Sequence, residues 1–169
     1  MLECTSWIGG SFNTGETHMN TPILFLDIDG VLNSHKKLAS GYCGIDRHNA
    51  EVLNKILYIV PDVKLVISSA WRYMILRKDM TLKGFEYLLQ IHGIDCNNRL
   101  HGCTSADSGM AHKLSHFDIA KWTELGLQWR VKQILEYIYE HKIERFVVVD
   151  DLPLIMQNFV HIDSKEGLT

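Results

Sequence analysis

Residues 23–30 read ILFLDIDG, four apolar residues followed by two aspartates that flank one isoleucine, and then a glycine. A short unbroken apolar run is typical of a strand that is buried on both faces. Side chains alternate along an extended chain, so Asp27 and Asp29 can point the same way just past that strand. Gly30 then lets the chain turn sharply. We therefore predict a buried strand over 23–26 with two carboxylates at its carboxyl end.

The rest of the chain alternates between apolar runs and helical patterns. Short apolar runs predict further strands over 63–67, 146–149 and 159–160. Apolar residues at helical spacing predict helices over 46–59, 81–92 and 128–141. The polar segment 101–126 has no such spacing, and we expect it to form a long loop. Strands that alternate with helices predict a parallel sheet with helices on both faces, a three-layer Rossmann-like α/β fold.

Length and composition favour one soluble domain. The chain has 169 residues, of which 46% are apolar and 22% are charged, the balance of a globular fold. The net charge of −3 indicates neither nucleic acid nor a membrane surface as a partner. Residues 1–20 show no periodicity, and we interpret them as a flexible tail or a non-native extension ahead of a domain over 21–169.

Cysteine use and hydropathy favour the cytoplasm. The four cysteines form no paired framework, and the first residues lack the basic and apolar segments of a signal peptide. No apolar run approaches the roughly 20 residues that a membrane span requires. We therefore expect a cytoplasmic protein without membrane contact, and no feature indicates an obligate protein partner.

Polar residues follow three of the predicted strands, at the edge where parallel sheets bind ligands. These residues are Asp27 and Asp29, Ser68 and Ser69, and Asp150 and Asp151. A cluster of carboxylates at one edge is unfavourable unless a cation neutralises it. Because oxygen ligands with few histidines or cysteines nearby favour Mg²⁺, the sequence predicts a magnesium site at this edge.

Neighbouring positions offer groups for a phosphate. Ser68 presents a hydroxyl that suits a phosphoryl oxygen, although Ser68 and Ser69 can instead cap the next helix. Arg130, near the start of the helix predicted over 128–141, can supply the positive charge that a transferring phosphoryl group needs. The predicted site therefore combines a metal with phosphate-binding groups.

The same residues resemble the motifs of a known superfamily. The stretch 27–33, DIDGVLN, resembles the first motif of the haloacid dehalogenase-like (HAD) phosphatases. Ser68 after an apolar run is similar to the second motif, in which either Ser68 or Ser69 can be the phosphate-binding residue, and Asp150-Asp151 resembles the fourth. Within the superfamily, the stretches 68–72, 100–104 and 167–169 look like a subgroup with a small cap that is associated with nucleic-acid repair enzymes.

The resemblance implies a role for each acidic residue. Asp27 forms an aspartyl-phosphate, and Asp29 protonates the leaving group and then activates water. Asp27, the backbone carbonyl of Asp29 and Asp150 hold Mg²⁺, with Asp151 as a supporting carboxylate. The third motif departs from the family, which usually has a lysine there. Arg130 or Lys132 must serve as the cationic phosphate ligand in this chain, and we favour Arg130.

The implied function is a Mg²⁺-dependent phosphomonoester hydrolase. About forty residues separate Asp29 from Ser68, too few for a large cap domain, so an open site is expected. Such a site tolerates a nucleotide or a nucleic-acid end as well as a small phosphorylated metabolite. Two alternatives are a signalling receiver domain and a catalytically idle domain that binds phosphate ligands or partners. The acidic pair comes last in this chain, unlike in receivers, and Asp29 is needed only for chemistry.

Overall fold

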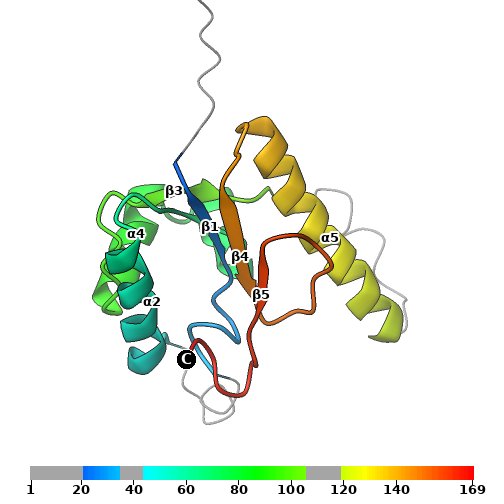
Figure 1. Cartoon of the computed structure of the whole chain (residues 1–169), viewed down its shortest axis with the longest axis horizontal. Helices are drawn as coiled ribbons and strands as arrows, with labels where there is room; N and C mark the ends of the chain where they lie inside the picture. The colour runs from blue at the N-terminus through cyan, green and yellow to red at the C-terminus, as the bar shows by residue number, and fades with distance from the viewer. Residues whose placement is uncertain (1–20, 35–43, 106–118) are drawn as a thin grey trace, which may run out of the picture.

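The computed structural model describes residues 21–34, 44–105 and 119–169, of which 119–126 are described by their backbone alone. Five strands form one parallel sheet in the order β3-β2-β1-β4-β5 (Figure 1). Their bounds are β1 (Ile23–Leu26), β2 (Lys64–Ile67), β3 (Leu100–Cys103), β4 (Phe146–Asp150) and β5 (Phe159–His161). All named strands of the described chain belong to this sheet, so no separate cap sheet is present among them.

The helices form two layers around the sheet. Their bounds are α2 (Arg47–Ile59), the 3₁₀ turn η1 (Ala70–Arg72), α3 (Tyr73–Leu76), α4 (Leu82–Ile91) and α5 (Ile119–Glu140). Figure 1 shows α2 and α4 on one side of the sheet and α5 on the other. The predicted three-layer α/β fold is therefore confirmed.

Strand β1 supplies side chains to both layers. Leu24 and Leu26 belong to the core on the α2 and α4 side. Ile23 and Phe25 belong to the core beneath α5, where the rings of Phe25 and Tyr137 meet edge to face at 5.8 Å. Fully burying a side chain of this size contributes about 1.5–3 kcal/mol. This double burial explains the unbroken apolar run and places the end of β1 at the centre of the sheet.

Side-chain caps determine where two helices begin. The carboxylate of Asp46 accepts a hydrogen bond from the His48 amide at 3.0 Å, at the start of α2. The hydroxyl of Thr81 accepts one from the Gly84 amide at 3.0 Å, at the start of α4. Each cap satisfies an amide that has no partner within its helix. Both predicted helices are therefore present near their expected bounds.

The predicted loop over 101–126 is wrong at both ends. Strand β3 occupies its beginning, and α5 starts at Ile119 instead of residue 128. The strand was missed because its sequence, LHGC, has neither an apolar run nor strict alternation. A Cβ atom on Gly102 would lie 2.5 Å from the hydroxyl oxygen of Tyr137, so any larger residue would have to displace that side chain of α5. The tail predicted over 1–20 lies outside the described residues, and no helix among those described is long and apolar enough to cross a membrane.

Candidate active site

Three carboxylates meet at the carboxyl end of the two central strands. Asp27 follows β1, Asp150 ends β4, and Asp151 comes directly after it. In the sheet register Leu26 lies beside Val149, and the Asp27 amide donates to the Val149 carbonyl at 3.0 Å. One oxygen from each of the three carboxylates lies within 4.8 Å of the others. We call Asp27, Asp150 and Asp151 the carboxylate cluster.

One guanidinium from α5 reaches this cluster. Arg130 Nη1 lies 2.6 Å from Asp150 Oδ2 and 3.2 Å from Asp27 Oδ1. Burial alone would lower the pKa of Arg130, but the charges of Asp27 and Asp150 outweigh burial and raise it. Arg130 therefore stays protonated and neutralises part of the negative charge.

The effect of the remaining negative charge is seen in the pKa of Asp150, which is fully buried. Its pKa is raised to about 7, chiefly by burial and also by the charge of Asp27, against the lowering effect of Arg130. Three carboxylates against one guanidinium suit an additional cation. The donors are carboxylate oxygens, which Mg²⁺ prefers, so the residues present fit this metal.

Asp29 lies in a different setting from the carboxylate cluster. Trp71 Nε1 donates to Asp29 Oδ1 at 3.0 Å and to Oδ2 at 3.1 Å. Asn33 Nδ2 donates to Oδ1 at 3.0 Å. We call this arrangement the Asp29 clamp, consisting of Trp71 and Asn33. The side chain of Asp29 is thus held by two neutral donors, while the backbone carbonyl is the atom that the resemblance assigns to the metal.

Gly30 allows the loop after β1 to pass close to the cluster. Its φ of +81° is left-handed, and a Cβ atom there would lie 2.3 Å from Asp151 Oδ2. The Gly30 amide donates to Asn33 Oδ1 at 2.9 Å, which orients the amide of Asn33 so that its nitrogen faces Asp29. Gly30 therefore leaves room for the carboxylate cluster, and its backbone amide orients the Asn33 side chain of the Asp29 clamp.

The two serines after β2 have separate environments. The hydroxyl of Ser69 accepts a hydrogen bond from the Trp71 amide at 3.3 Å and caps the turn η1. Ser68 Oγ is buried and has no hydrogen-bond partner among the described residues. Buried hydroxyls are normally paired, so an unpaired one at this edge suits a bound oxygen ligand. The geometry thus distinguishes Ser68, as the phosphate candidate, from Ser69.

Arg72 was not among the predicted phosphate ligands. Its side chain supports the site through hydrogen bonds with neighbouring protein groups. Its Nη1 donates to the carbonyls of Ser68 and Ser69 at 2.9 and 2.8 Å, and Nη2 donates to Gln133 Oε1 at 3.0 Å. Its Nε donates to the Ser105 carbonyl at 3.3 Å. Burial lowers the pKa of Arg72, and Arg130 lowers it further. This residue ties the ends of β2 and β3 to α5.

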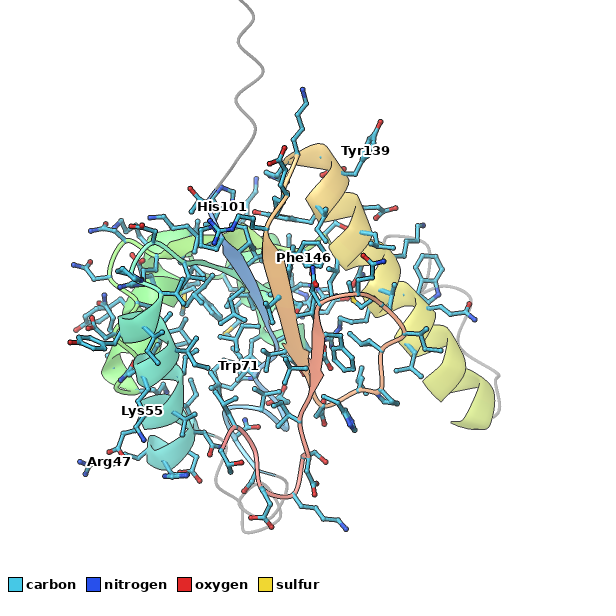
Figure 2. All side chains as sticks on the ribbon, viewed as in Figure 1. Arg47, Lys55, Trp71, His101, Tyr139 and Phe146 are labelled. Carbon is cyan, nitrogen blue, oxygen red and sulfur yellow. The ribbon has the colours of Figure 1, made fainter. Side chains whose placement is uncertain are left out.

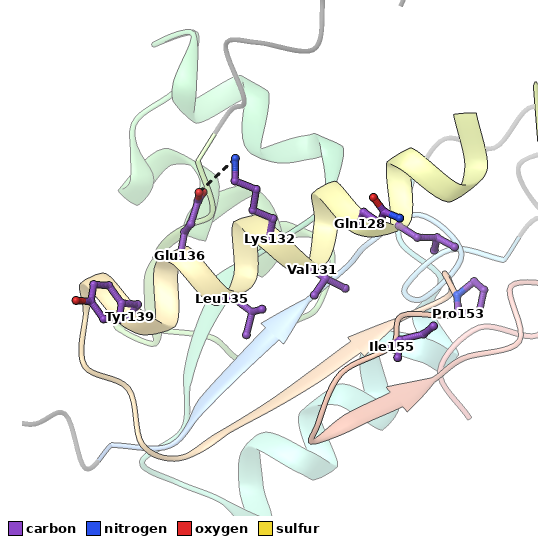
Figure 3. Close-up of a pocket in the computed structure, with 9 residues that line it drawn as sticks. Gln128, Val131, Lys132, Leu135, Glu136, Tyr139, Pro153 and Ile155 are labelled. Atoms are coloured by element: carbon purple, nitrogen blue, oxygen red, sulfur yellow. Dashed lines mark ion pairs between the residues drawn. The ribbon is translucent and has the colours of Figure 1, made fainter. Parts of the chain in front are cut away.

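Lys132, the alternative to Arg130, makes other contacts. Its ammonium lies 3.6 Å from Glu136 Oε1 and 4.5 Å from the centre of the Trp129 ring. Figure 3 shows this ion pair on α5, and both residues are among those that line an apolar groove of about 630 Å³, which extends to Pro153 and Ile155. Of the two candidate cations, the structure therefore brings only Arg130 to the carboxylate cluster.

Fold and site together define a haloacid dehalogenase-like domain: a parallel sheet whose central strands carry the DxD pair and the later acidic pair at one edge. The chain belongs to the family described as the HAD domain in Swiss Army Knife RNA repair proteins, which residues 23–169 match. This match confirms the resemblance that the sequence motifs indicated. No curated protein and no solved structure matches the chain.

Sequence reasoning missed Trp71 and Asn33 as site residues. Both lie within stretches that carry the family resemblance, 68–72 and 27–33. Their contacts with Asp29 depend on tertiary structure, since 42 positions separate Trp71 from Asp29 in the chain. The available signal was the presence of side-chain N–H donors inside the stretches that carry the family resemblance.

Proposed function

We propose that the protein is a Mg²⁺-dependent phosphomonoester hydrolase that works through an aspartyl-phosphate on Asp27. One observation carries this proposal: the two aspartates of the DxD pair lie in different chemical settings. Asp27 belongs to the carboxylate cluster with Arg130, whereas Asp29 is held apart by two neutral donors. A nucleophile and an acid–base group require such a separation of environments.

In the first step, an Asp27 oxygen attacks phosphorus as the bond to the leaving oxygen breaks. Asp29 donates its proton to that leaving oxygen, so the product departs as an alcohol. In the second step, Asp29 takes a proton from water as the water oxygen attacks phosphorus. The bond to Asp27 then breaks, and both aspartates return to their starting states.

The other site residues are assigned supporting roles. Asp27, the Asp29 carbonyl and Asp150 would hold Mg²⁺, with Asp151 beside them; the bound metal neutralises charge on the transferring group. Ser68 Oγ is available to donate to a phosphoryl oxygen. Arg130 restrains Asp27 and adds positive charge at the same edge of the sheet.

We further propose nucleotides or phosphorylated nucleic-acid ends as the substrate class. The description of the family, as domains of RNA repair proteins, supports this choice. The single sheet of the described residues also supports it, because a bulky polymer end needs an open approach. A small phosphorylated metabolite remains the competing substrate.

The direct test measures phosphate release from three substrate groups: nucleoside monophosphates, oligoribonucleotides with a 3′ or 5′ phosphate, and small sugar phosphates. Each is assayed with Mg²⁺ and with chelator, for the wild type and for Asp27→Asn. Metal-dependent release that Asp27→Asn abolishes is the expected result. Saturable binding of the same compounds without any release would support the idle binding module instead.

A further inference from the structure

The Asp29 carboxylate is held by a ring nitrogen that comes from another strand end. Trp71 Nε1 lies 3.0 and 3.1 Å from the two Asp29 oxygens, so one N–H is shared between them. In Figure 2, Trp71 lies beyond the carboxyl end of β1, at the end of the sheet opposite His101. The indole is thus placed beside the DxD pair although it belongs to the segment after β2.

The surroundings of Trp71 make it a rigid donor. Its own amide is capped by Ser69 Oγ, and its ring packs against the core on the α2 and α4 side. The next residue, Arg72, is buried and anchored to the Ser68 and Ser69 carbonyls. The fixed backbone and the packing of the ring together restrict where Nε1 can lie.

The chemistry of the indole suits the neighbour of an acid–base group. An indole N–H donates a hydrogen bond and accepts none, so it cannot take the proton that Asp29 must deliver. It is also uncharged, unlike the guanidinium that faces Asp27. A donor shared between both oxygens fixes the plane of the carboxylate and leaves other lone pairs open for proton exchange.

We propose that Trp71 is a positioning residue for the proton-transfer steps, orienting Asp29 toward the leaving oxygen and then toward water. This inference rests on the proposed phosphatase function. Asn33 assists from within the loop, but its amide depends on the Gly30 contact for orientation, whereas the indole has only one way to donate. Correct placement of an acid is worth large rate factors, because small displacements of a catalytic group slow the reaction strongly.

The test is Trp71→Phe, which keeps an aromatic ring and removes the N–H. For a nucleotide substrate, whose alcohol leaves poorly, kcat should fall at least about tenfold while KM changes little. For nitrophenyl phosphate, release of the first nitrophenol should be much less affected, so the dependence of rate on leaving-group pKa becomes steeper. Unchanged leaving-group dependence would overturn the proposal.

Tyr137→Phe is the matched control. It removes one aromatic hydrogen bond, between Tyr137 Oη and His101 Nδ1 at 2.8 Å, from a buried ring of α5. It should leave the leaving-group dependence at the wild-type value even if it lowers thermal stability. A change as large as that of Trp71→Phe would mean that general loosening of the fold explains both variants, and the positioning role would be rejected.

A double-mutant comparison separates this role from a structural one. If Trp71 acts through Asp29, Trp71→Phe should have almost no further effect in the Asp29→Asn background. An equal loss in both backgrounds would contradict the proposal. If Trp71→Phe fails to fold, benzothienylalanine at position 71 replaces the N–H with sulfur in a ring of nearly the same shape, with the same expected outcomes.

Failure of this inference can be told apart from failure of the proposed function. A wild type that releases no phosphate from any of the three substrate groups refutes the phosphatase proposal itself. A wild type that is active, with an Asp29→Asn variant sensitive to the leaving group and a Trp71→Phe variant that is not, refutes only the role of Trp71.

Discussion

Asp27 and Asp29 are two positions apart, yet the structure gives them opposite environments. Asp27 is buried among two further carboxylates and one guanidinium, where unbalanced charge attracts a cation. Asp29 is only half-buried and is held by the neutral donors Trp71 and Asn33. The comparison teaches that identical side chains acquire different chemistry from their neighbours: one is suited to attack and metal binding, the other to moving a proton.

The largest predicted effect is a loss of turnover on substitution in the carboxylate cluster. Asp27→Asn removes the attacking oxygen and keeps the shape, so turnover should fall by several orders of magnitude. Initial rates with a nucleotide substrate measure the loss, and circular dichroism checks that the fold persists. Near-normal hydrolysis by this variant would show that Asp27 is not the nucleophile and that the two environments do not divide the chemistry.

The metal prediction compares the two residues of the acidic pair. Asp150 is buried and contacts Arg130, whereas Asp151 is half-buried. Asp150→Asn should raise the Mg²⁺ concentration needed for half-maximal activity by about 10- to 100-fold, more than Asp151→Asn does. Titration of activity with Mg²⁺ measures both values. Equal metal dependence would mean that the pair has been assigned in the wrong order.

Gly30 contacts both the carboxylate cluster and the Asp29 clamp, and Gly93 offers a matched control. Both have a left-handed φ, +81° and +86°, but a Cβ atom on Gly93 meets no other atom within 4 Å. Alanine at position 93 should cost about 1 kcal/mol of unfolding free energy from backbone strain alone. Alanine at position 30 also collides with Asp151, so it should cost more and reduce activity. Denaturant unfolding compares them, and equal costs with full activity would refute the close approach.

A further prediction concerns stability as a function of pH. The pKa of Asp150 is raised from 3.8 to about 7, so the folded state keeps a proton that the unfolded state has released between these values. In chelator, this group therefore lowers the unfolding free energy as pH rises from 4 to 7, and the loss is complete above 7. Because Mg²⁺ binds the ionised form, its stabilising effect should be larger at pH 8 than at pH 5.5.

Thermal melts with chelator and with Mg²⁺ at both pH values test this prediction. Asp150→Asn is the control, since it removes the titrating group and should flatten the contribution of Asp150 to the pH dependence. A Mg²⁺ effect that is the same at both pH values in the wild type would contradict the assignment of the raised pKa to the metal site.

The sequence was sufficient for the cluster because its residues follow strong strand signals. Parallel strands end at the same edge, so the apolar runs before Asp27 and Asp150 placed both carboxylates together without further information. Strand β3 was missed because LHGC carries no strand pattern, and its pairing with β2 is a property of the sheet. The early start of α5 was missed because Gly126 lies within the helix, and glycine is unfavourable in a helix interior.

The choice between Arg130 and Lys132 required the packing of α5. Two residues apart on a helix, they point to nearly opposite sides, and sequence alone does not say which side faces the sheet. The Asp29 clamp could not be predicted from the sequence for a different reason. Its central contact joins positions 42 apart in the chain, which no local pattern encodes.

The division of chemistry between Asp27 and Asp29 is tested most directly by rapid mixing of Asp29→Asn with nitrophenyl phosphate. Nitrophenolate leaves readily without a proton, so Asp27 should still be phosphorylated, whereas breakdown of the aspartyl-phosphate should be slow because water is no longer activated. The account predicts a burst of about one nitrophenol per protein molecule, followed by slow turnover. No burst, together with an equal loss of activity on nitrophenyl phosphate and on a nucleotide, would contradict it.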